Sequence, residues 1–132
     1  MEKGKTIIND SVFVEIAREA MKKVEDVFRE EKQGALRGFT RVFTERFTPQ
    51  ITVKKTENTE PDNGFGTLSL DVKISVIYGV NIPEVARKTR EKIISEIETL
   101  TGYSVERVDI EIDKIVKPEQ ISEEKPEEQE EG

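Results

Sequence analysis

The stretch that decides the fold is YGVNIPEVARKTREKIISEIETLTGYSVERVDIEI, residues 78–112. Asn81 is a favourable N-cap residue, and Glu84 three positions later completes a capping-box pattern. Apolar residues then recur at helical spacing as far as Gly102, a residue type that commonly ends helices in the left-handed conformation. Apolar residues return through 105–115 at strand spacing, so this stretch predicts a helix followed by a strand.

The sequence upstream supplies two more strands. Residues 67–78 alternate apolar and polar side chains, as in a strand with one buried face. A turn-rich stretch at 57–66 separates them from a second alternating run at 50–56, which predicts an antiparallel hairpin. The helix that follows residue 81 then predicts a parallel pairing between strand 67–78 and the last strand.

The N-terminal part predicts a short strand at 5–8 and a long amphipathic helix from about residue 12 to residues 30–34. Asn9 and its two polar neighbours offer caps for that helix. The secondary structure of residues 35–47 stays ambiguous. Phenylalanines four residues apart favour a helix, whereas the glycines and threonines favour a strand or loop.

These elements predict an α+β fold, a two-layer sandwich with two helices packed on one face of a largely antiparallel sheet. We expect one domain at 1–117 and a disordered acidic tail at 118–132. Residues 119–132 hold seven Glu and one Lys, a net charge of −6 out of the total of −7. The remaining residues are therefore close to neutral, and the acidity belongs to the tail.

The amino-acid composition limits the reactions that the chain could catalyse. The chain has no cysteine and no histidine, which excludes thiol nucleophiles, thiolate metal sites and the usual proton shuttle near neutral pH. We therefore expect a protein that is not an enzyme. The sequence contains no long apolar run and no apolar signal-peptide core, so the expected compartment is the cytoplasm.

Three carboxylates on the last strand could hold a metal. Asp109, Glu111 and Asp113 occupy alternate positions, roughly 6.5–7 Å apart in a strand. Mg²⁺ or Ca²⁺ would accept such oxygen ligands, but no glycine-containing ion loop accompanies the three residues. We predict a solvated outer face, paired with lysines such as Lys73, and no metal or cofactor.

A basic and aromatic segment is the second candidate. It spans residues 37–55 and mixes cations with aromatic rings. Its members are Arg37, Phe39, Arg41, Phe43, Arg46 and Phe47, followed by Lys54 and Lys55. Such a segment can stack bases and hold phosphates, so a small RNA- or ribosome-associated module is the alternative function. The near-neutral domain and the acidic tail favour a protein interface instead, for a partner or for self-association. The phenylalanines could also complete the core.

The sequence from 78 to 112 resembles the alkaline shock protein family, the envelope stress response proteins of Gram-positive bacteria. The matching positions are Tyr78, Gly79, Asn81, Ile82, Glu84, Val85, Ala86, Thr101, Gly102, Val105, Val108, Asp109, Ile110 and Ile112. The chain departs from the family after the first helix, where Gln33-Gly34-Ala35 replaces Pro-Gly-Val. The resemblance covers most of residues 4–116.

The resemblance implies a cytoplasmic protein that gathers at the inner membrane by binding a small membrane-anchoring protein. It implies a non-catalytic adaptor or scaffold in the envelope stress response, with no catalytic residues to transfer. The motif residues themselves also indicate a non-catalytic role, because they are suited to shape turns and helix ends rather than to perform chemistry. These five residues are Tyr78, Gly79, Asn81, Glu84 and Gly102.

The composition of the tail leads to a first prediction. Truncation after Pro118 should shift the thermal midpoint by no more than a few degrees, because surface changes usually alter stability by less than about 0.5 kcal/mol. Thermal unfolding followed by circular dichroism measures the shift. A large fall in the midpoint would mean that the tail docks on the domain.

Overall fold

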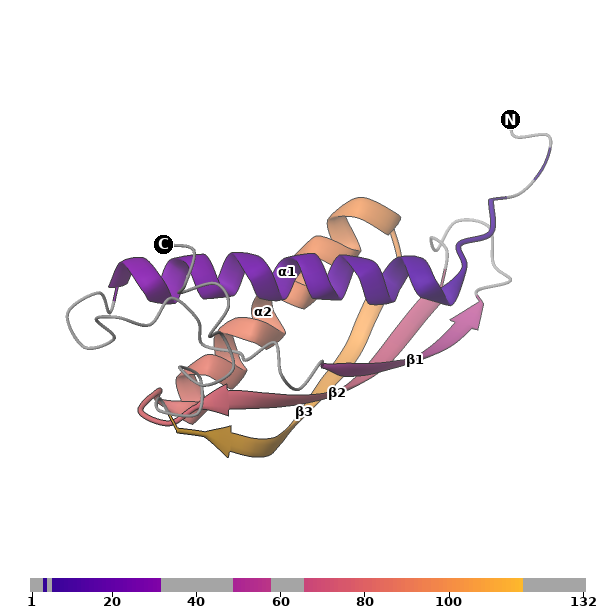
Figure 1. Ribbon diagram of the computed structural model, residues 1–132. Helices are drawn as coiled ribbons and strands as arrows, with labels where there is room; N and C mark the ends of the chain where they lie inside the picture. The colour runs from indigo at the N-terminus through magenta and orange to yellow at the C-terminus, as the bar shows by residue number, and fades with distance from the viewer. Residues whose placement is uncertain (1–3, 5, 32–48, 58–65, 118–132) are drawn as a thin grey trace, which may run out of the picture.

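The computed structural model describes residues 4, 6–31, 49–57 and 66–117 (Figure 1). Two helices and three strands occupy these ranges. In chain order they are α1 (Asp10–Glu31), β1 (Gln50–Glu57), β2 (Gly66–Ile77), α2 (Ile82–Thr101) and β3 (Ser104–Val116). The predicted segment 35–47 and the predicted acidic tail lie outside the described residues.

The strands form one mixed sheet in the order β1-β2-β3. β1 pairs with β2 antiparallel, as the turn-rich stretch between them predicts, and β2 pairs with β3 parallel across the α2 crossover. Figure 1 shows both helices on the same side of this sheet. The predicted α+β class, with two helices on one sheet face, is therefore confirmed. The sheet is mixed rather than largely antiparallel, because the α2 crossover makes β2 and β3 parallel.

β2 carries the centre of the core. Its side chains at alternate positions from Leu68 to Val76 point to the helices and are at most 1% exposed. α1 and α2 cover them with residues spaced at helical intervals: Phe13, Ala17, Ala20, Met21, Val24, Val85, Ile93 and Ile97. Full burial of one such large apolar side chain contributes about 1.5–3 kcal/mol, so this cluster dominates stability.

The prediction of a strand at residues 5–8 is wrong for the residues that the structure describes. Residues 6–9 adopt no regular structure. The reason is local. The Asn9 side chain accepts a hydrogen bond from the Ser11 amide at 2.9 Å, which starts α1 immediately after this short segment. Ile8 packs against the core instead, and its carbonyl accepts a hydrogen bond from Lys55 Nζ at 2.6 Å.

The ends of α2 match their sequence signals. Asn81 Oδ1 accepts a hydrogen bond from the Glu84 amide at 2.9 Å, and Pro83 lies in the first turn. Gly102 has φ 82° and donates its amide to the Glu98 carbonyl at 3.1 Å. A side chain there would be strained, because left-handed backbone conformations favour glycine.

A second prediction concerns this N-cap. Asn81→Ala should destabilise the domain by about 1 kcal/mol, since it removes the acceptor of the Glu84 amide. The thermal midpoint should fall by several degrees, whereas Asn81→Asp, which keeps an acceptor, should stay near the wild type. Equal midpoints for the alanine variant and the wild type would contradict this role of Asn81.

Candidate functional site

The face of the sheet opposite the helices is polar. The strand register aligns its side chains in rows, so that Thr52, Asp71 and Asp109 are neighbours across the three strands. The next row is Gln50, Lys73 and Glu111, and the row on the other side is Lys54, Ser69 and Arg107. We call this surface the outer face. Among the described elements, no helix covers it.

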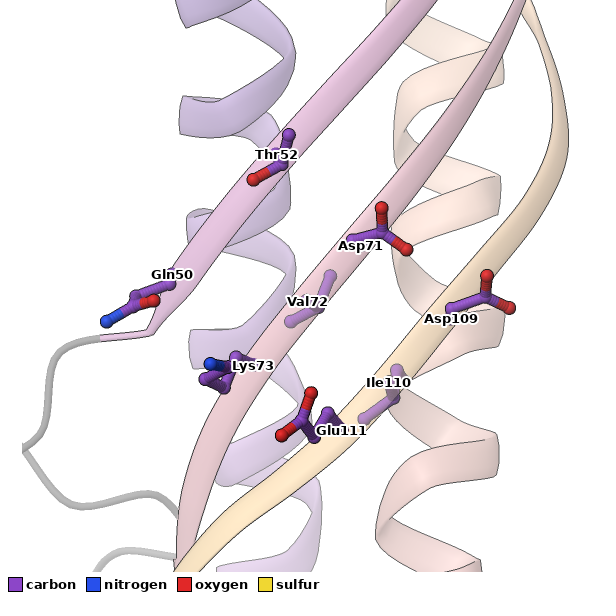
Figure 2. Close-up of a pocket in the computed structure, with 8 residues that line it drawn as sticks. All are labelled: Gln50, Thr52, Asp71, Val72, Lys73, Asp109, Ile110 and Glu111. Carbon is purple, nitrogen blue, oxygen red and sulfur yellow. The ribbon is translucent and has the colours of Figure 1, made fainter.

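The twisted sheet forms a shallow concavity of about 320 Å³ on the outer face. Figure 2 shows its polar side chains arranged along all three strands. The lining residues are Gln50, Thr52, Asp71, Val72, Lys73, Asp109, Ile110 and Glu111. Sequence positions some sixty residues apart meet here only because of the strand pairing.

The charges in the concavity have both signs. Asp71 lies directly beside Asp109 in the parallel register, and Lys73 lies beside Glu111. Arg107 Nε donates a hydrogen bond to Asp109 Oδ2 at 2.8 Å. This hydrogen bond and the charge of Asp109 raise the pKa of Arg107 above its ordinary value. The cation offsets the repulsion between the two aspartates.

The three carboxylates predicted to share one strand face do not stay together. The register between β2 and β3 shifts between Ile74 and Ser75, so that Asp113 has no partner in β2. Such an irregularity interrupts the alternation of side chains. Asp109 and Glu111 line the concavity, while Asp113 forms an ion pair with Lys114 at 3.4 Å. In the part of the chain that the structure describes, no three acidic side chains could hold a metal ion.

The six predicted interface residues, Arg37, Phe39, Arg41, Phe43, Arg46 and Phe47, lie outside the described residues. Two lysines just beyond them are described, and they have different roles. Lys54 is exposed on the outer face. Lys55 points to the helix side, where its ammonium lies 3.6 Å from the Asp10 carboxylate and 5.9 Å from the Phe13 ring centroid. It joins β1 to the start of α1.

The motif residues lie at the two ends of α2. Tyr78 is 62% exposed, and its amide donates to the Val116 carbonyl at 2.9 Å, which ties the end of β2 to the end of β3. Gly79 has φ 112°, a conformation in which other residues are strained, at the exit from β2. These contacts are structural, as the physical reading of the motif predicts.

A second concavity of about 340 Å³ lies between the helices, lined by Lys23, Val24, Lys88, Glu91, Lys92 and Ser95. Its lysines are compensated by glutamates. Glu96 lies 3.0 Å from Lys23 Nζ and 3.7 Å from Lys92 Nζ. The mixed charge of this groove gives no preference for an anion, and the outer face is the stronger candidate surface.

Sequence comparison identifies the family. The sequence model of the alkaline shock protein 23 family, described by its cell envelope-related function, matches residues 1–117. The chain therefore belongs to the alkaline shock protein 23 family, as the motif from residue 78 to residue 112 predicts. No solved structure matches the chain. Neither of the described helices is long and apolar enough to cross a membrane.

A third prediction concerns metal binding at the outer face. Addition of Ca²⁺ or Mg²⁺ at about 1 mM, the range of weak protein sites, should leave the thermal midpoint unchanged. The physical reason is that Lys73 and Arg107 stand among the carboxylates and repel a cation. A metal-dependent rise in the midpoint that is lost in Asp109→Asn would contradict this expectation.

Proposed function

We propose that this protein is a non-catalytic adaptor or scaffold of the envelope stress response, acting from the cytoplasm. A membrane protein recruits it to the inner face of the membrane. The observation that carries the proposal is the family match over residues 1–117, because the family has a cell envelope-related function. Tyr78, Gly79, Asn81, Glu84 and Gly102, five of the residues that match the family motif, shape turns and helix ends.

The character of the outer face supports a binding role. Its carboxylates are exposed, its Lys73 is half-buried, and they lie on a shallow surface. Catalytic sites usually hold their charged groups where water is excluded, since low polarity strengthens electrostatic stabilisation. An open surface with both signs of charge is suited instead to a charged protein partner.

The contact with the partner is proposed for residues 36–55. The aromatic and arginine residues of this segment are the types enriched at the centres of interfaces. Its described part lies in β1, which pairs with β2 alone among the described strands and carries Lys54 on the outer face. Cations close to a cytoplasmic leaflet also gain about 1 kcal/mol each from anionic lipid.

A fourth prediction tests this proposal in cells. The double variant Phe39→Ser/Phe43→Ser should lower the membrane-associated fraction roughly tenfold or more, since truncated interface anchors commonly cost that much affinity. Fractionation and fluorescence localisation measure recruitment, and the thermal midpoint of the purified variant reports its fold. Normal recruitment of a folded variant, or outright unfolding, would contradict the proposed contact.

A matched control is available on α2. Arg87→Ser/Glu91→Ser removes an exposed ion pair at 3.4 Å and leaves the net charge unchanged. Recruitment should persist in this variant, because exposed pairs of this spacing contribute only about 0.3–0.5 kcal/mol to stability. RNA retention by the wild type that falls steeply with salt would favour the nucleic-acid alternative instead.

A further inference from the structure

β3 is covered along only part of its free flank. One flank pairs with β2, and no described strand lies beside the other. In the first half of β3, side chains of α2 reach this free flank. Glu98 accepts a hydrogen bond from the Val105 amide at 2.9 Å, and Arg90 Nε donates to the Val108 carbonyl at 3.0 Å. Covering an edge is a common protection against the addition of another strand.

The second half of β3 lacks such a cover among the described residues. The Val108 carbonyl faces away from β2, and residues two apart in a strand direct their main-chain groups to the same flank. Ile110 and Ile112 therefore also direct theirs away from β2. Within the described part of the chain, no hydrogen bond engages these outward groups. The open edge runs over residues 110–115, a length typical of one strand.

The side chains of this open edge are apolar on the helix side of the sheet. Ile110 and Ile112 align with buried residues of β2 and are themselves half-buried at the margin of the core. Ile115 aligns with Val76 and is 48% exposed. A strand added at this edge could therefore cover apolar surface with apolar residues at alternate positions.

The net charge of the chain is concentrated at this edge and in the sequence that follows it. Of the 28 acidic and 21 basic residues, ten and three lie in residues 109–132, a net charge of −7. The 18 residues of each sign in residues 1–108 cancel. The field of residues 109–132 therefore attracts cations, whereas the rest of the chain has no net preference.

Two of these acids border the open edge directly. Asp109 and Glu111 are exposed at alternate positions on the outer face of β3. Arg107 bonds to Asp109, and Lys73 lies beside Glu111, so both carboxylates have a cation on the side of the sheet. A carboxylate can accept several hydrogen bonds, and each therefore keeps capacity for a cation that approaches from the free flank.

We propose that the free flank of β3 at residues 110–115 binds an extended, cationic segment of a partner protein, which adds to the sheet as a further strand. Main-chain hydrogen bonds to Ile110 and Ile112 provide affinity, and the alternating side chains provide specificity. Apolar residues of the segment lie beside the isoleucines, and its Lys or Arg residues lie beside Asp109 and Glu111. This surface is separate from residues 36–55 and does not depend on the envelope role.

The chemistry of the occupant follows from both halves of β3. An acidic segment would place like charges opposite Asp109 and Glu111, which destabilises a strand pair. A segment that extended past Val108 would meet the side chains of Arg90 and Glu98. The occupant is therefore a short segment in which cations alternate with apolar residues.

A synthetic peptide tests this proposal. The probe is a short, fluorescently labelled peptide in which lysine alternates with valine, and its anisotropy is measured with the full chain over a salt series. It should bind, and salt should weaken the binding by screening the charges. A peptide of the same composition with its lysines grouped at one end should bind at least roughly tenfold more weakly, because the alternation is lost. Equal binding of the two peptides overturns the proposal.

Two charge reversals on β3 locate the site. Glu111→Lys should weaken binding of the probe roughly tenfold, because it places like charges opposite one another. Glu106→Lys makes the same change of charge at an exposed position in the covered half, and should weaken binding by less than about threefold. Thermal midpoints near that of the wild type show that both variants are folded. An equal loss in both variants overturns the proposal.

Truncation after Pro118 separates the edge from the tail. It removes residues 119–132 and their net charge of −6. Binding of the probe should weaken and become less dependent on salt, because less of the attracting charge remains. Binding should persist, because the open edge is intact. Complete loss of binding would assign the probe to the tail alone and overturn the proposal.

Main-chain pairing has a signature of its own. Alternate amides of the bound probe face β3, and the remaining amides face away from it. Of two probes that are N-methylated at one or the other alternate set, only one should lose binding. Amide exchange at Ile110 and Ile112 should slow roughly tenfold or more when the unmodified probe binds. The same response from both methylated probes overturns the proposal, as does loss of probe binding at high protein concentration, which would give the edge to a second copy.

Discussion

The rest of the structure depends on the two-sided character of β2. Its side chains from Leu68 to Val76 alternate between a buried set under the helices and a polar set on the outer face. Because it lies between β1 and β3, a shift of its register by one residue would turn the buried set to solvent and change both neighbouring strands. The same constraint that builds the core therefore also sets which charges meet on the outer face.

This arrangement places most of the stabilising contacts on one side of the sheet. Helix contacts, caps and the Phe13–Tyr103 ring contact, with ring centroids 5.1 Å apart, lie on one side of the sheet or at its ends. Among the described elements, no helix covers the outer face on the other side.

The sequence predicted the structure correctly wherever the pattern that indicates a helix, strand or helix end lies within a single element. The alternation of β2, the N-cap at Asn81 and the left-handed glycine at 102 predicted strands and helix ends that the structure confirms. It failed at residues 6–8, where Ile8 packs against the core, Ile7 is 71% exposed, and no strand pairing forms among the described residues. The proximity of Asp71 and Asp109 was also missed, because only the register brings these positions together. The irregularity that displaces Asp113 left no signal in the spacing of the carboxylates.

The long separation in sequence between α1 and the elements it packs against has a kinetic consequence. Lys23 of α1 bonds to Glu96 of α2 across 73 positions, whereas β2, α2 and β3 follow one another directly. Closing the larger loop costs more chain entropy, although the cost grows only with the logarithm of loop length. The β2–α2–β3 unit is thus suited to act as the folding nucleus, with α1 docking late and leaving early. Amide hydrogens of α1 would then exchange with solvent through a partial opening that leaves the parallel pair intact.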